Sequence, residues 1–326
     1  MIEHWISLGF TANWIREIKN FINYKKGFFI PFIHDIHFAH FDANLIPSGR
    51  SPQRMTEKEV KYFLKICSIN GLKTTLLLNS GDYDLFTVIN ILDSFYLPLG
   101  VRSVVISDKS LARKISSLYP ELLIQGSCIS YIDTIYGLLE EKSYGIELHN
   151  PATWTIRNMP FIKSVNESGY KQKLIPFEGC VRKCELEGWH RNEAVKGRYH
   201  DFDATCKRVV TSIYVFLMSS WVTIEQLRRM ESYIDVLKLP RNTFDNFDEF
   251  YRFINLYETN EPYNILDFYG TFLSQIKKDN VIMSNVFDDS FFDNTISDKI
   301  NQDFLMPYIK KLDRIPYFKK MDGMGV

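Results

Sequence analysis

Short apolar runs alternate with amphipathic segments of helical length nearly to residue 240, and this alternation constrains the fold more than any other feature. The runs predict strands between which helices lie, and Thr56 with Glu59 forms a capping-box pattern at the start of one of these helices. The predicted strands cover residues 4–10, 27–33, 72–79, 101–107, 122–128, 144–149, 172–177 and 234–240.

These strands are predominantly apolar rather than alternating, which is typical of parallel strands covered on both faces. Eight strand-then-helix units favour a closed (β/α)8 barrel of the TIM type over an open doubly wound sheet. Residues 1–241 are predicted to form this barrel, with a cysteine-containing loop at 178–206, while 209–221 leave open an additional strand. Residues 242–326 are predicted to form a C-terminal helical and irregular extension packed on the barrel.

The composition argues against several classes of protein. Lys plus Arg and Asp plus Glu both number 39, so no basic excess marks a general nucleic-acid or membrane-surface binder. The first residues, MIEHWISLGF, carry charges where a signal peptide is apolar, and no run is long enough to span a membrane. We therefore expect a cytoplasmic protein with no membrane partner. Its cysteines are expected to be ligands or core residues rather than disulfides.

A cysteine-rich segment follows the strand predicted at 172–177. Cys180 and Cys184 come directly after an apolar run, and Cys206 follows further along the chain. Thiolates are the ligands that iron–sulfur clusters and zinc prefer, so these three cysteines are predicted to bind a metal. Their spacing matches neither the Cys-x-x-Cys pair of zinc ribbons nor the cysteine run of radical-SAM enzymes.

The fourth metal ligand is left open by this spacing. Cys128 is the first choice, because it ends a different strand on the same predicted rim, and His190, water or substrate are alternatives. Cys67 lies on an apolar helix face and is interpreted as a core thiol.

In a barrel of this kind the active site lies at the carboxyl ends of the strands. The loop histidines His34, His37 and His40 recur every third residue, which suits no single strand face, so they are interpreted as capping or hydrogen-bonding residues. For Arg50, Lys238 and Arg241 the alternative to substrate binding is that they form ordinary salt bridges at the rim. The predicted acid–base residues are Glu147, His149 and Asp108, and the predicted substrate-binding residues are Arg50, Asn79, Glu178, Lys238 and Arg241.

Several stretches together resemble the collagenase-like peptidase family, peptidase family U32. They are SVVISD at 103–108, IQGSCIS at 124–130, EGCVRKC at 178–184 and IDVLKLPR at 234–241. The resemblance covers roughly residues 1 to 260, and it implies a kinship to oxygen-independent hydroxylases that hold a [4Fe–4S] cluster on four cysteines. Such relatives act on ubiquinone precursors or on bases of transfer or ribosomal RNA.

For this chain the resemblance implies Cys180, Cys184 and Cys206 as cluster ligands. The chain departs from the family pattern in the position of the fourth cysteine, in Cys128 within the turn at 127–129, and in a last strand that lacks the usual glycine.

Three functions are compatible with these features. The favoured one is a cytoplasmic iron–sulfur enzyme that acts on a small molecule or a nucleobase. The second is a hydrolase or peptidase in which a zinc ion in the same loop activates water, although the sequence contains no His-Glu-x-x-His motif or nucleophile elbow. The third is a non-catalytic subunit with a structural metal that forms a homodimer or heterodimer with a related chain.

Overall fold

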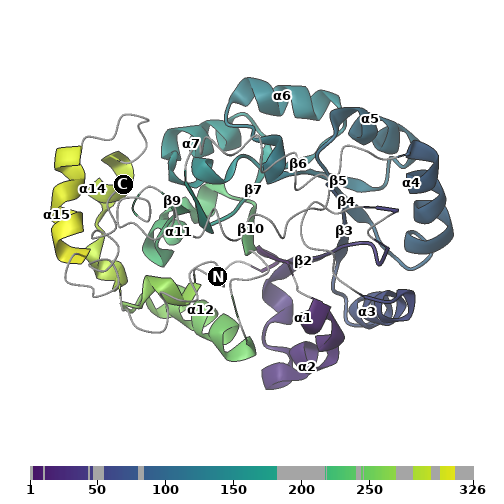
Figure 1. Cartoon of the computed structure of the whole chain (residues 1–326), viewed down its shortest axis with the longest axis horizontal. Coiled ribbons are helices and arrows are strands. Elements are labelled where there is room, and N and C mark those ends of the chain that lie inside the picture. Colours follow the sequence, from purple (N-terminus) through teal and green to yellow (C-terminus); the bar gives the residue numbers. More distant parts are fainter. Residues whose placement is uncertain are drawn as a thin grey trace, which may run out of the picture.

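Parallel strands close into a barrel at the centre of the molecule, with helices around its outside (Figure 1). The computed structural model describes residues 3–9, 12–42, 45–46, 55–79, 84–181, 217, 219–239, 244, 246–268, 282–294 and 302–312. Around the barrel the strands follow the order β1-β10-β7-β6-β5-β4-β3-β2. The predicted (β/α)8 barrel is therefore confirmed.

The barrel strands pair in parallel throughout, as at Leu77 beside Val105 and Val105 beside Gln125. Their bounds are β1 (Ile6–Gly9), β2 (Ile33–Phe38), β3 (Thr74–Leu78), β4 (Ser103–Ile106), β5 (Leu123–Gly126), β6 (Leu148–His149), β7 (Lys171–Leu174) and β10 (Val236–Leu239). A separate antiparallel pair is formed by β8 (Phe177–Val181) and β9 (Ser219–Trp221). The end of the ambiguous segment 209–221 is thus a strand, but it lies outside the barrel sheet.

Helices connect the parallel strands, because such strands need long crossovers. Side chains at the N-caps accept backbone hydrogen bonds at most of the helix starts, and the predicted capping box of Thr56 and Glu59 is present. The helices are α1 (Ala12–Arg16), α2 (Ile18–Asn23), α3 (Glu57–Ile69), α4 (Leu85–Ile91), α5 (Lys109–Leu118), α6 (Ile135–Ser143), α7 (Met159–Glu167) and α11 (Ile224–Met230).

The second barrel strand begins where the sequence predicted it to end. Residues 27–33, predicted as a strand, instead form short 3₁₀ turns around Tyr24–Gly27 and Ile30–Phe32. Their aromatic side chains pack outward, with the ring centroid of Phe29 4.6 Å from that of Phe250 in the extension. The strand itself is β2, so His34, Asp35 and His37 belong to the barrel wall rather than to a loop.

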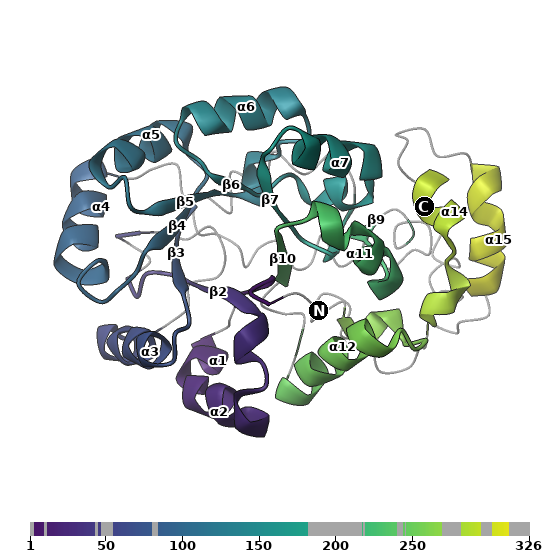
Figure 2. The ribbon, with the colours of Figure 1, turned by 180° about the vertical axis from the view of Figure 1, so that it is seen from behind.

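The described residues after β10 lie on one side of the barrel (Figures 1 and 2). They contain α12 (Phe247–Thr259), α14 (Asp289–Asn294) and α15 (Gln302–Leu312). Beside α14, the Trp221 ring of β9 contacts Phe287 with ring centroids 4.9 Å apart. The boundary at residue 241 between two domains stays a prediction. Within the described ranges, no helix combines the length and apolar character that crossing a membrane requires.

Candidate functional site

The inner face of the barrel carries buried polar side chains on almost every long strand. Successive side chains of a strand point to opposite faces. Ile36, Leu76, Val104 and Ile124 face outward and belong to the hydrophobic core beneath the helices. The residues next to them face inward, and this inner layer consists of Ser7, Asp35, His37, Thr75, Ser103, Gln125 and Lys173, all of them buried.

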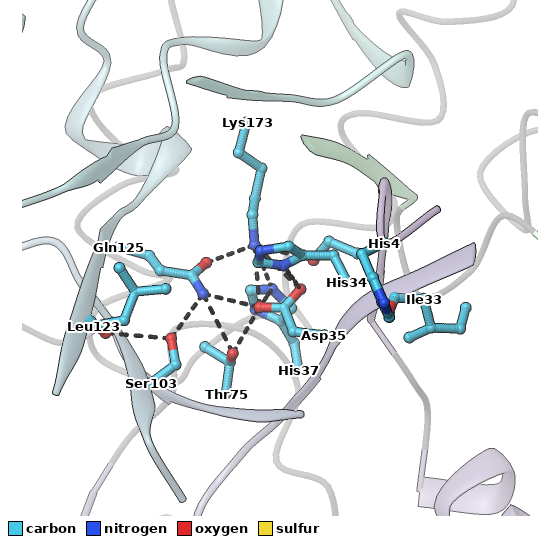
Figure 3. A network of polar contacts seen from close by, with 11 residues as sticks. His4, Ile33, His34, Asp35, His37, Thr75, Ser103, Leu123, Gln125 and Lys173 are labelled. Atoms are coloured by element: carbon cyan, nitrogen blue, oxygen red, sulfur yellow. Dashed lines mark hydrogen bonds and ion pairs between the residues drawn. The ribbon is translucent and has the colours of Figure 1, made fainter. Parts of the chain in front are cut away.

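Lys173 of β7 is the centre of this layer (Figure 3). Its Nζ lies 3.2 Å from Asp35 Oδ2, 3.1 Å from Ser7 Oγ and 3.1 Å from His37 Nε2. It also donates a hydrogen bond to Gln125 Oε1. An ammonium group has three hydrogens, and Ser7, Asp35 and Gln125 each supply an acceptor for one of them.

Asp35 receives hydrogen bonds from the other side of the layer. Thr75 Oγ1 donates to Asp35 Oδ2 at 2.6 Å, and Gln125 Nε2 donates to the same oxygen at 2.8 Å. Gln125 Nε2 also lies 2.7 Å from Ser103 Oγ. Because Gln125 accepts from Lys173 and donates to Asp35, it links the cation to the carboxylate through its amide.

The burial of these groups changes their protonation. Burial alone would raise the pKa of Asp35, but attraction to Lys173 and His37 and hydrogen bonds from His34 and His37 hold it well below its ordinary range. Burial, only partly offset by Asp35, lowers the pKa of Lys173 to about 8. Burial also lowers the pKa of His37 to about 3. The attraction to Asp35 opposes this change, but the positive charges of Lys173 and Lys238 offset part of that attraction. At neutral pH the layer therefore holds a carboxylate, an ammonium group and a neutral imidazole.

Lys238 of β10, a predicted substrate-binding residue, lies beside this layer and acts on it through its charge. It pairs in register with Ser7 of β1. Its positive charge contributes to lowering the pKa values of both His37 and Lys173. The structure thus brings one predicted site residue to the buried cluster.

The predicted acid–base residues have separate surroundings. His149 Nδ1 lies 2.8 Å from Glu141 Oε2 on α6, and both side chains are buried. His149 therefore faces the helix layer outside the barrel, while Glu147 is exposed. Asp108 caps α5 and accepts a hydrogen bond from the backbone nitrogen of Leu111 at 2.6 Å. The structure does not bring these three side chains together as one site.

Asn79 and Cys128 follow barrel strands at their carboxyl ends. The backbone oxygen of Asn79 accepts a hydrogen bond from Ser107 Oγ at 3.0 Å. Cys128 is a free, buried cysteine in the 3₁₀ turn Cys128–Ser130 directly after β5. Cys67 is buried in α3, as expected of a core thiol.

The remaining predicted site residues lie outside the part of the chain that the structure describes. These are Arg50, Cys184, His190, Cys206 and Arg241, together with the side chains of Glu178 and Cys180, whose backbones belong to β8. Among the described residues, no group of three or more His, Cys, Asp or Glu side chains is arranged to hold a metal ion. The metal ligands and the cofactor stay predictions.

Lys173 and Gln125 are not among the residues predicted from the sequence. Lys173 carries no clear signal, because β7 has the mostly polar sequence KQKL. Gln125 does carry one, because it is the polar residue of the otherwise apolar β5, LIQG. Such a residue has to point into the barrel when its neighbours pack against the helices. The misplaced second strand put Asp35 and His37 in the loop that follows it, which concealed that both side chains point into the barrel.

Comparison with known proteins gives a likeness in fold. No protein-family model matches the sequence, and no curated protein matches it. The solved structure of the U32 peptidase Mk0906 aligns with a TM-score of 0.52 at 13% identity, covering 73% of this chain and 93% of that one. In fold, this chain is similar to a U32 peptidase. The resemblance to that family is therefore supported at the level of the fold alone.

A second solved structure aligns over more of the chain but less closely. It is 2,3-dimethylmalate lyase, a member of the PEP mutase/isocitrate lyase superfamily, with a TM-score of 0.41 at 9% identity over 95% of this chain and 92% of that one. The likeness is too low to bear on the function.

Proposed function

We propose that this chain is an enzyme whose substrate binds at the carboxyl ends of the barrel strands, next to the buried cluster around Lys173. The observation that carries this proposal is the ion pair of Lys173 and Asp35 beside a neutral His37 inside the barrel. Barrel interiors are ordinarily filled with Val, Ile and Leu, and apolar residues of similar volume stabilise a core at least as well as a buried ion pair. Strongly perturbed pKa values also concentrate at functional sites.

The cluster is suited to proton transfer and to stabilising negative charge. With a pKa of about 8, Lys173 keeps its proton at neutral pH and releases it more readily than an exposed lysine. The neutral imidazole of His37 offers both a donor and an acceptor. Lys238 adds a second positive charge to the same region, which favours a substrate that becomes negatively charged during the reaction.

We further propose that a [4Fe–4S] cluster held by Cys180, Cys184, Cys206 and Cys128 serves this enzyme, as in the hydroxylase-like relatives. Four thiolates are the donor set that such a cluster takes, and it supplies electron transfer when bound. Cys128 directly follows β5, and the backbone of Cys180 follows β7 after a few residues, so both leave the barrel at its carboxyl side. The substrate would be a small molecule or an RNA base, in the reducing cytoplasm.

A second candidate function is metal-dependent hydrolysis. The similarity in fold to Mk0906, which is described as a U32 peptidase, favours it. In this alternative the same cysteines would hold zinc, which lowers the pKa of a bound water molecule.

Metal analysis of protein purified without oxygen separates these proposals. Iron with acid-labile sulfide and a brown colour supports the hydroxylase-like function. Zinc in place of iron supports hydrolysis. Protein that takes up neither metal, even after reconstitution with iron and sulfide or with zinc, contradicts both metal proposals.

A further inference from the structure

Asn150 is a buried residue whose side chain lacks hydrogen bonds. It directly follows β6 and is only 2% exposed. Within the described part of the chain, neither its Oδ1 nor its Nδ2 has a hydrogen-bond partner. Buried polar groups are almost always paired, because leaving them unpaired costs stability. An amide with both ends unpaired at this position therefore points to a ligand.

The direction of the neighbouring side chain places Asn150 towards the barrel interior. His149 points outward to Glu141 on α6. Leu148 pairs in register with Gln125 of the buried layer. Because side chains alternate along a strand, Asn150 points inward, one level closer to the carboxyl end than Gln125.

Asn79 shows the same feature on the other side of the barrel. It follows β3, whose Leu78 faces the hydrophobic core, so alternation directs Asn79 inward as well. Its Oδ1 is buried and has no hydrogen-bond partner among the described residues. The two strands that precede these amides both end at the carboxyl mouth of the barrel, above the layer that contains Lys173.

We infer that Asn150, together with Asn79, binds a neutral ligand group in which a hydrogen-bond donor and an acceptor stand side by side, as along the edge of an amide or lactam. A carboxamide side chain pairs with such an edge through one donated and one accepted hydrogen bond. A carboxylate offers acceptors alone and an ammonium group donors alone, so each leaves half of the asparagine amide unpaired. The inference rests on the proposed function for the location of the site, but it requires no metal.

Saturation-transfer NMR with the full chain tests this binding. The probe is 2-piperidinone, a lactam with adjacent donor and acceptor, and the control probe is cyclohexanone, which has the acceptor alone. The native protein should bind 2-piperidinone, and Asn150→Leu should bind it about tenfold more weakly. Cyclohexanone should bind weakly to both proteins.

Thermal unfolding of the same variant separates ligand binding from a structural role. Leucine has the same branched shape and the same number of side-chain heavy atoms as asparagine, and it removes an unpaired buried amide, so Asn150→Leu should unfold at the same or a higher temperature than the native protein. A lowered unfolding temperature, lactam binding that is undiminished in Asn150→Leu, or no lactam binding to the native protein would each overturn the inference. Both measurements are independent of metal content, so they stand even where the metal analysis fails.

Discussion

Lys173 Nζ lies 3.2 Å from Asp35 Oδ2, and this ion pair is completely buried inside the barrel. The two residues come from β7 and β2, which are not neighbours in the sheet. Their contact therefore crosses the barrel interior rather than running along its wall. A buried ion pair of this kind adds little to the free energy of unfolding compared with apolar residues of similar volume. Removing one partner alone is strongly destabilising, because it leaves the other charge buried and unpaired.

Replacing Lys173 should destabilise the fold strongly. Lys173→Met leaves Asp35 as a buried charge without its cation, and we expect the free energy of unfolding to fall by about 3 to 5 kcal/mol in urea titrations. The double variant Lys173→Met with Asp35→Leu should recover much of this loss. As a control, Lys61→Met removes the exposed pair with Glu57 on α3 and should cost less than about 1 kcal/mol. Equal losses in Lys173→Met and Lys61→Met would contradict the account.

Acid should destabilise the protein through His37. The unfolded imidazole takes up a proton near its ordinary pKa of 6.5, whereas the folded one stays neutral until about pH 3. The unfolded state thus binds more protons in this window, so stability falls as the pH drops from 6.5 towards 3, by about 5 kcal/mol in full. Asp35 adds a loss at lower pH still, because its folded pKa lies below its ordinary value.

Urea unfolding at a series of pH values measures this effect. His37→Gln should lose less stability on acidification than the native protein. Parallel curves for the native protein and His37→Gln would show that His37 is not held neutral by the fold.

His149 should be a structural residue. His149→Phe preserves the ring beside Tyr170 but removes the hydrogen bond to the buried Glu141 carboxylate, and we expect a loss of about 3 kcal/mol in the free energy of unfolding. Adding Glu141→Leu should restore much of it. Unchanged stability in His149→Phe would instead favour the acid–base role predicted from the sequence.

Arg157 should hold the extension to the barrel. Its guanidinium donates to the backbone oxygens of Trp221 and Leu217 at 2.8 and 2.7 Å, and it lies 5.2 Å from the ring centroid of Phe291 in the extension. Arg157→Lys loses the planar contact and at least one of these bonds, so we expect a cost of about 2 kcal/mol in urea unfolding. Arg113→Lys is the matched control, because that exposed guanidinium contacts only a surface ring, Tyr144, among the aromatic contacts described. Similar costs for both variants would argue against the anchoring role.

The barrel was predictable because its strands are short and apolar and recur with helices between them. The error at β2 has a physical cause. Residues 27–33 are more apolar than the true strand, IHDIHF, because Phe29 uses its side chain to pack on Phe250 far along the chain, which no local pattern reveals.

The site was predictable only in part. Lys238 follows from its place near the carboxyl end of the last strand, whereas Lys173 lies within β7, where the polar Lys171 and Gln172 before it leave nothing to single it out. His149 was predicted to face the pocket, yet it points outward to Glu141 of the helix α6. The direction of a strand side chain is set by the strand register, which the sequence of a two-residue strand barely specifies.

The most direct test of the proposed iron–sulfur enzyme is the iron and sulfide content of cysteine variants purified without oxygen. We predict about four iron atoms per chain in the native protein and in Cys67→Ala, whose thiol is buried in α3 away from the barrel mouth. Cys128→Ala and Cys180→Ala should each lose most of this iron while remaining folded by circular dichroism. Iron that is absent from the native protein, or that is unaffected by both variants, would contradict a cluster at the carboxyl mouth of the barrel.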